Sequence, residues 1–481
     1  MTKSNAIKYL VPLFFLMVAV AVTVSCGGGG GGGGGSSEGT GIVRTTITDP
    51  PICQAPAGPF EKVWVTITRV RAHISDYASP DGGGWVDLVD LRDEPRQIDL
   101  LSLATTTCIL TELGTSGELP VGKYQQIRLY LLSNDPAPNE TVPAPADNAC
   151  NDAGGYNCVV FPDESVQILL LSSQAQTGIK IPPGQIEGGG LIVTAGDVVD
   201  LNIDFDACSS VVQQGNGGYR LKPTLHAGEV SVSSGAITGR VIEQNTTTPI
   251  PNAIVLLERR DPSDSGIDRV ITQRLTGPDG TFALCALSPG YYDVVVAAKT
   301  FSGAVTKTYN ATVTLNVPLG TATTTMGDIP LAPESGSSLP ATIGGQVSTS
   351  AGNPPAGTES DVVLTALQPV SDGALLVTVP IFNSTSSSVT VDTAADSCGD
   401  GCANFSLEVP ASNPRVGTYS PTPPTSYAAP LPGDINYAVS ARAFRDDEAN
   451  CSPPSKIFTA IKVQPGLETG ISTIEFTGCT P

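Results

Sequence analysis

Three aspartates in the segment 198–206 have a spacing that could support chemistry. Asp200, Asp204 and Asp206 differ by even numbers of positions, in a stretch where apolar and polar residues alternate. On a β-strand these side chains would therefore project from one face. Carboxylates gathered in this way can bind Ca²⁺ or act as an acid and base pair. The alternative, which we prefer, is an acidic sheet face that keeps the domain soluble.

A second group of aspartates surrounds two cysteines near residue 400. Asp392, Asp396 and Asp400 lie beside Cys398 and Cys402. Crowded carboxylates could bind Ca²⁺, but this spacing does not follow the alternate-residue ligand pattern of an EF-hand loop. We prefer a small acidic loop closed by a disulfide. Whether either aspartate group binds a metal stays open.

The chain contains two histidines, His73 and His226, each within a strand-like stretch. Neither has a cysteine or a second histidine at metal-binding spacing, and neither begins a His-Glu-x-x-His motif. Both are predicted to be structural residues of a sheet. We expect no catalytic residues and no cofactor, and therefore a protein that is not an enzyme. A glycosidase-type enzyme, the less favoured alternative, would need the aspartates of 198–206 to form a catalytic pair.

Aromatic residues offer another kind of site, a platform on which a sugar ring can stack. Trp64 lies in an alternating segment and is predicted to be core, whereas Trp85 follows three glycines and is a candidate for exposure. Tyrosines at strand starts or in loops either form such a platform or close the ends of β-sandwiches: Tyr291, Tyr292, Tyr419, Tyr427 and Tyr437. We prefer the second interpretation.

The elements that must position these residues are strands. Segments such as 63–68, 126–131 and 198–205 alternate apolar and polar residues, and breaks rich in Pro, Gly, Asn and Asp separate them. The one helix that we expect is short, around 99–110. This pattern predicts an all-β domain over 41–232 with the architecture of a β-sandwich.

Five stretches of this domain have a recognisable order along the chain. They are 63–70, 96–101, 119–129, 178–182 and 201–206, which together span most of the domain. In this order they resemble a family of bacterial lipoprotein domains of unknown function. That family has no known catalytic residues, so the resemblance implies a fold and no chemistry.

Residues 235–332 form a second predicted unit. In the turn 276–282, Pro278 presets φ and Gly280 permits a positive φ, while 287–296 places Pro-Gly-Tyr-Tyr at the start of a strand. These stretches resemble the carboxypeptidase regulatory-like domain, a seven-stranded prealbumin-like sandwich. The resemblance implies a non-catalytic module, and related sandwiches in other proteins bind glycans.

A third unit over 337–481 is predicted from a degenerate internal repeat. Three pairs of stretches match: 236–241 with 341–347, 281–284 with 404–407, and 292–296 with 437–441. We therefore expect a third β-sandwich after the second, with residues 334–338 as the linker between them.

Residues 1–25 have the organisation of a secretory signal. Lys3 and Lys8 give the first residues a positive charge. An apolar run follows over 9–24, which is short for a membrane span. A small residue then precedes Cys26. The segment resembles a bacterial lipoprotein signal peptide, which implies cleavage before Cys26 and lipidation of this cysteine. An uncleaved membrane anchor is the alternative.

Residues 26–40 would then form the lipidated cysteine and a Gly-rich tether. Nine consecutive glycines follow Cys26, and such a run behaves as a flexible linker. Acyl chains on Cys26 would hold the protein at a bilayer without a helix. The expected localisation is the bacterial cell envelope, as a membrane-anchored lipoprotein in the periplasm or on the outer-membrane surface.

The cysteine count fits an oxidising compartment. The chain has 11 cysteines, and without Cys26 an even number remains, as a set of disulfides requires. The pairs that we predict first are close within one unit: Cys150 with Cys158, Cys398 with Cys402, and Cys451 with Cys479. The full connectivity does not follow from the sequence.

The charge balance restricts the partners. The 481 residues include 46 acidic and 25 basic ones, which gives a net charge of −21 and too few cations to bind nucleic acid. We predict a non-catalytic envelope lipoprotein of tandem Ig-like or prealbumin-like β-sandwiches that acts in binding, adhesion or structure. Its partners would be the membrane, through the lipid, and a glycan or an envelope protein. Carbohydrate binding through the second unit is the alternative function.

Overall fold

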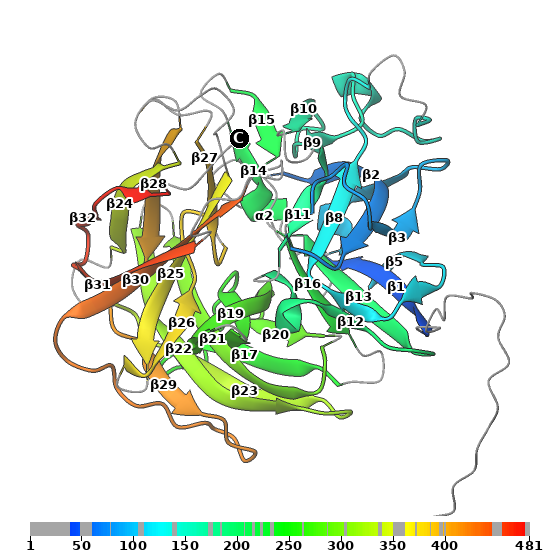
Figure 1. Ribbon diagram of the computed structural model, residues 1–481. Coiled ribbons are helices and arrows are strands. Elements are labelled where there is room, and N and C mark those ends of the chain that lie inside the picture. The colour runs from blue at the N-terminus through cyan, green and yellow to red at the C-terminus, as the bar shows by residue number, and fades with distance from the viewer. Residues whose placement is uncertain are drawn as a thin grey trace, which may run out of the picture. The chain divides into compact units, whose positions relative to one another are not determined.

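The computed structural model of the chain is all-β, as the alternating pattern predicts (Figure 1). It describes residues 39–48, 60–76, 78–103, 110–136, 142–171, 177–182, 185–205, 207–213, 217–221, 225–230, 235–261, 264–285, 287–302, 305–334, 339–349, 361–370, 373–384, 386–393, 398, 401–444 and 455–476. Within these residues no helix has the length and apolar character needed to cross a membrane.

The first unit consists of two main sheets that share one apolar core. One sheet has the order β16-β13-β1-β5, with β6 paired to β1: β16 (Leu225–Val230), β13 (Val198–Phe205), β1 (Thr40–Thr48), β5 (Thr111–Thr115) and β6 (Leu119–Pro120). The other has the order β11-β8-β2-β9-β10-β15-β14: β11 (Ile179–Ile181), β8 (Gln126–Leu131), β2 (Lys62–His73), β9 (Cys158–Val160), β10 (Val166–Leu171), β15 (Tyr219–Leu221) and β14 (Val211–Gln213).

Smaller elements complete this unit. Strands β3 (Val86–Asp90) and β4 (Arg96–Asp99) pair with β2, and β7 (Gly122–Tyr124) pairs with β12 (Leu191–Val193). The helical pieces are η1 (Leu100–Leu103), η2 (Asn151–Ala153), η4 (Glu187–Gly189) and α2 (Ala207–Ser210). The helix expected around 99–110 is therefore the single 3-10 turn η1, and residues 104–109 lie outside the described residues.

Strand β2 shows how the alternation places side chains. Val63 and Val65 are fully buried in the core, whereas Trp64 between them points to the opposite face and is half-buried. The prediction that Trp64 is core is therefore wrong, because neighbouring residues of a strand project to opposite faces. A register shift between Ile67 and Arg69 reverses the alternation, so this opposite face also carries Arg69 and Arg71.

The second unit packs a small sheet against a larger one. The small sheet has the order β20 (Thr281–Leu284), β17 (Ile237–Glu243) and β23 (Thr324–Leu331). The strands that face it are β18 (Ile254–Asp261), β21 (Gly290–Ser302) and β22 (Val305–Leu319). Tyr292, Val294 and Val296 of β21 lie in the core between the two layers, which confirms that they share one face.

The larger sheet does not end with the second unit. It continues from β19 (Asp264–Leu275) to strands of the third unit in the order β26 (Leu375–Val379), β25 (Asp361–Val370), β30 (Ile435–Phe444) and β31 (Ser455–Val463), and β27 (Val389–Asp392) pairs with β25. At the junction Ile267 of β19 lies opposite Leu376 of β26 in a parallel bridge. At the other edge β29 (Arg415–Thr418) pairs with β22. One sheet of ten described strands thus runs through both units (Figure 1).

Both faces of this shared sheet are buried where it crosses the second unit. Val255 and Leu257 of β18 lie in the core of the second unit, whereas Leu256 between them lies in the core of the third. On β21, Val294 and Val295 divide between the two cores in the same way. Strands buried on both faces carry continuous apolar runs, and here the runs are 254–257 and 294–298.

The third unit repeats the strand pairing of the second. Its small sheet contains β28 (Cys402–Val409), β24 (Ala341–Ser348), β32 (Glu468–Gly470) and β33 (Ile474–Glu475). Strand β24 has an antiparallel neighbour and parallel neighbours in the same arrangement as β17. Gly239 lies opposite Phe282, and Gly345 lies opposite Phe405. A Cβ on either glycine would come within 2.9 Å of the phenylalanine Cζ, so both sites need glycine.

The predicted linker 334–338 begins with a buried residue. Glu334 is 7% exposed, and its carboxylate accepts hydrogen bonds from the Thr308 hydroxyl and the Ala411 backbone N–H. These partners belong to the second and the third unit. Residues 335–338 lie outside the described part of the chain. Glu334 is therefore part of the contact between the units and not an exposed linker residue.

Candidate functional site

The aspartates of β13 that are described lie on one face, as predicted, and each is paired. Asp200 forms an ion pair with Arg44 of β1, with 2.7 Å from Nε to Oδ1. Asp204 accepts a hydrogen bond from the Thr48 hydroxyl at 2.9 Å. The parallel register of β1 and β13 places both partners directly opposite their aspartates. Asp206 lies outside the described residues.

Asp204 also connects the first unit to the second. The Thr272 hydroxyl of β19 donates to Asp204 Oδ2 at 2.9 Å, and Arg274 Nη1 lies 3.2 Å from Oδ1. The side chains of Asp204 and Arg274 are 4% and 14% exposed. A charge buried to this extent requires an oppositely charged partner, and Asp204 and Arg274 neutralise each other. Asp204 therefore acts as an anchor between units.

His226 of β16 lies opposite Asp204 in the antiparallel pair of β13 and β16. Burial lowers the pKa of His226, and the charge of Asp204 opposes this effect without cancelling it. His73 receives a hydrogen bond from the Ser75 backbone N–H at 2.8 Å, and its Nε2 lies 3.0 Å from the Gly83 carbonyl oxygen. Both histidines are held within sheets, as the sequence predicts.

A polar cavity of about 90 Å³ is lined by residues of all three units. His226 contributes from the first unit, Arg269 from the second and Ser388 from the third. Arg269 is paired with Asp261, with 2.9 Å from Nε to Oδ2. A cavity of this size can accommodate a few water molecules. Its polar lining indicates a hydrated junction between the units.

The second group of aspartates is described only in part. Asp392 ends β27, its side chain is not described, and Asp396 and Asp400 lie outside the described residues. The disulfide predicted between Cys398 and Cys402 is present. In the part of the chain that the structure describes, no three His, Cys, Asp or Glu side chains are grouped to hold a metal ion.

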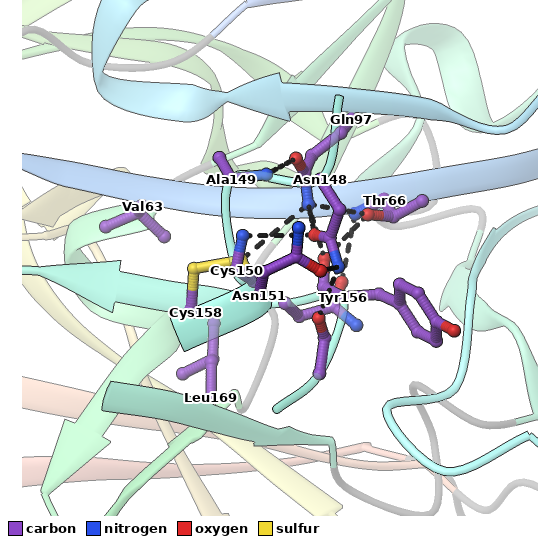
Figure 2. Close-up of a disulfide and its surroundings, with 12 residues drawn as sticks. Val63, Thr66, Gln97, Asn148, Ala149, Cys150, Asn151, Tyr156, Cys158 and Leu169 are labelled. Atoms are coloured by element: carbon purple, nitrogen blue, oxygen red, sulfur yellow. Dashed lines mark hydrogen bonds between the residues drawn. A yellow bond between two sulfur atoms is a disulfide. The ribbon is translucent and has the colours of Figure 1, made fainter. Parts of the chain in front are cut away.

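The predicted disulfide between Cys150 and Cys158 is also present, and both cysteines are fully buried (Figure 2). Gln97 of β4 forms hydrogen bonds with the segment that contains this disulfide: its Nε2 donates to Asn148 Oδ1 at 2.9 Å and to the Tyr156 carbonyl oxygen at 3.0 Å. Figure 2 shows this network beside the S–S bond. The disulfide and the side chain of Gln97 thus hold the loop against β2.

The other cysteine predictions have different outcomes. Cys285 is disulfide-bonded. The pair Cys451 and Cys479 lies outside the described residues, and so does Cys26, the predicted lipidation site. These two predictions stay predictions.

The aromatic residues do not gather into one platform. Tyr292 and Tyr437 are buried, and their hydroxyls donate to the carbonyl oxygens of Ser288 and Pro410. Tyr419 and Tyr427 pack against the core of the second unit. Tyr291 is 68% exposed. Trp85 is half-buried, with its Nε1 donating to the Ser79 carbonyl oxygen at 2.6 Å.

Two clusters appear only in the tertiary structure. On the shared sheet, the carboxyl groups of Glu258, Asp268 and Asp293 lie together on three strands, and Arg260 pairs with the latter two. Burial raises the pKa of Glu258 well above its usual range, and burial with the neighbouring Asp293 raises the pKa of Asp268 to about 7. Such carboxyl groups can retain a proton near neutral pH.

The other cluster, which we call the basic cluster, consists of Arg69, Arg71, Arg128 and Lys180 on the second sheet of the first unit. Its members are 52 to 111 positions apart except for the two on β2, so that their proximity is a product of strand pairing. The sequence signal for this cluster was the spacing of Arg69 and Arg71, two positions apart on β2. It indicates a shared face but not what lies opposite.

The family comparison covers the first unit. Residues 40–223 match a family model described as a domain of unknown function, DUF4382. The match confirms the resemblance of this unit to a family of unknown function and covers less than half of the chain. A comparison with curated proteins finds no match.

Solved structures similar to this chain include a minor pilin and a putative cell adhesion protein. The Bacillus anthracis TIE protein has 11% identity and a TM-score of 0.15, and the match covers 91% of this chain and 51% of that protein. This chain thus spans about half of its length. The minor pilin GBS52 of Streptococcus agalactiae has 10% identity and a TM-score of 0.19, with 51% and 97% covered. A putative cell adhesion protein from Bacteroides ovatus has 12% identity and a TM-score of 0.16, with 51% and 93% covered. Scores this low assign neither fold nor function.

Proposed function

We propose that this chain is a non-catalytic, lipid-anchored protein of the bacterial cell envelope that acts as an adhesion or structural module. The observation that carries the proposal is the sheet shared by the second and third units, with both of its faces buried. Units joined in this way transmit force and position as one piece. The paired state of Asp200 and Asp204 supports a structural role for the residues that were the strongest catalytic candidates.

The anchor rests on the sequence of the first 40 residues. Metabolic labelling with an alkynyl fatty acid tests it: the wild-type chain should carry the label, and Cys26→Ala should not. Cys285→Ser would serve as a cysteine control that keeps the label. Label that persists in Cys26→Ala, or a mature chain that begins elsewhere, would contradict the anchor.

The adhesion or structural role is tested on cells. Cells that lack the chain should lose attachment to a surface or integrity of the envelope, and the full chain should restore it. A variant with Asp204→Asn, which weakens the contact between units, should restore it less well than Asp200→Asn. Full function of a chain released from the membrane, or hydrolytic activity lost on substitution of one carboxylate, would contradict this role.

Carbohydrate binding through the second unit is the alternative, and Tyr291 supports it because it is the exposed tyrosine at the start of β21. A glycan array with the purified chain tests this function. Binding should decrease in Tyr291→Ala and should not change in Tyr419→Phe. An array without any bound glycan would refute the alternative.

A further inference from the structure

The basic cluster places like charges directly opposite one another. Across four neighbouring strands the register brings together Lys180 of β11, Arg128 of β8, Arg71 of β2 and Asp87 of β3. Like charges in direct register on a sheet repel each other and destabilise the pairing. Arg128 is 1% exposed and Lys180 is 9% exposed, so that water screens this repulsion poorly. Such an arrangement is favourable only where negative charge compensates it.

Asp87 supplies negative charge beside the two arginines of β2. Its Oδ1 lies 3.2 Å from Arg71 Nε and 3.9 Å from Arg69 Nε. Behind these two arginines, Arg128 donates from Nη1 to the carbonyl oxygens of Thr177 and Gly178, both at 3.3 Å.

The guanidinium groups at the edge of the cluster have donors to spare. The side chains of Arg69 and Arg71 are 19% and 18% exposed, and neither donates a hydrogen bond to any described residue. The hydroxyl of Tyr130, beside them, is buried without a hydrogen-bond partner among the described residues. Each guanidinium carries five N–H donors, and buried polar groups in folded proteins are normally satisfied.

Aromatic rings hold these guanidinium groups in place. Arg69 lies over the ring of Tyr130, with 4.6 Å from Cζ to the ring centroid. The ring of Trp85 lies 5.3 Å from Arg71 Cζ and 5.6 Å from Arg128 Cζ. Stacking fixes the orientation of a guanidinium and leaves its edge N–H groups available. The donors are therefore ordered before any ligand arrives, which lowers the entropic cost of binding.

We propose that the basic cluster binds an oxyanion group, a carboxylate or sulfate, which approaches from solvent and is held by Arg69 and Arg71. The planar fork of arginine fits the two oxygens of such a group, and the charges of Arg128 and Lys180 behind it strengthen the attraction. Two sources share this chemistry: a free organic acid, and an acidic sugar within a polymer. The site lies in the first unit and does not depend on the lipid anchor or on the adhesion role.

Calorimetric titration of the purified full chain tests the proposal. The probes are sodium glucuronate, sodium sulfate and an oligogalacturonate, each at low and at high ionic strength. Saturable binding should weaken with salt and should become at least about tenfold weaker in Arg69→Gln/Arg71→Gln, because charge-assisted hydrogen bonds are lost. Arg71→Lys should lose part of the affinity, since lysine keeps the charge and lacks the fork. Arg44→Gln, an exposed arginine paired with Asp200, is the matched control and should bind like the wild type.

The comparison of glucuronate with the oligogalacturonate distinguishes a free acid from an acidic polymer as the ligand. Equal binding of glucuronate and the oligomer per acidic group would assign a free acid, and tighter binding of the oligomer would assign a polymer; both support the site. If the double variant does not fold, the weaker binding expected for Arg71→Lys and the expected weakening of binding by salt test the site instead. Absence of saturable binding for all three probes, or unchanged affinity in a folded double variant, would overturn the proposal.

Discussion

Replacement of Asp204 by asparagine tests the anchor between the first and second units. The amide keeps the shape of the side chain and an oxygen that can accept from Thr48 or Thr272. It removes the charge that faces Arg274, whose side chain is 14% exposed. The guanidinium would then be left without its carboxylate partner in a poorly hydrated position.

The magnitude follows from this geometry. Removal of one partner of a buried ion pair costs about 3–5 kcal/mol, because the other charge stays buried. Arg274 also donates to the Gln273 carbonyl oxygen at 2.7 Å, which compensates part of this cost. We therefore expect Asp204→Asn to lower the free energy of unfolding by about 3 kcal/mol. Asp200→Asn should cost less than about 1 kcal/mol, since Arg44 is half exposed and solvent screens the pair.

Urea unfolding of the purified chain, followed by circular dichroism, measures the difference between these two variants. Asp200 is a matched control because it has the same residue type, strand and face. A double-mutant cycle with Arg274→Met isolates the pairwise energy, and Asp204→Asn should cost much less in that background. Equal costs of the two asparagine variants, or a coupling energy near zero, would refute the reasoning.

Other predictions concern the core and the disulfides. Burial and the neighbouring Asp293 raise the pKa of Asp268 to about 7, so the native state holds this proton more tightly than the unfolded state does. The resulting stability should be present below about pH 4 and should be lost as pH rises through about 7. Asp268→Asn should therefore flatten this pH dependence of urea unfolding. Leu256→Ala should cost about 2–5 kcal/mol and lower the thermal midpoints of the second and third units together, whereas separate midpoints would argue against a shared core. Replacement of Cys150 and Cys158 by serine should cost about 2.5 kcal/mol from the loss of a short loop closure, and peptide mapping without reductant that found free thiols in the wild type would contradict the bond.

The sequence alone determined the elements and their faces. The alternation in β13 fixes which side chains share a face, because strand geometry has a period of two. In β2 a register shift between Ile67 and Arg69 reverses the faces, which the alternation does not show. The repeat of the glycine opposite a phenylalanine, at Gly239 and again at Gly345, was detectable as matching stretches. Cysteines separated by 8 and 4 positions were correctly paired, since a short loop keeps both ends close.

Continuous apolar runs carry more information about this fold than the alternation does. The runs 254–257 and 294–298 indicate strands buried on both faces, and they would have predicted a sheet shared between units. The carboxyl cluster around Asp268 gave no such signal, because its members are on three different strands.

Only the tertiary structure decided what each face meets. Asp204 was a candidate ligand by its spacing, but Thr272 and Arg274, 68 and 70 residues further along the chain, make it an anchor. Arg71 and Arg128 became one cluster when β2 paired with β8 in a particular register. A strand's own sequence specifies its two faces, whereas its neighbours are selected by non-local pairing and by burial of the whole sheet, which no local pattern records.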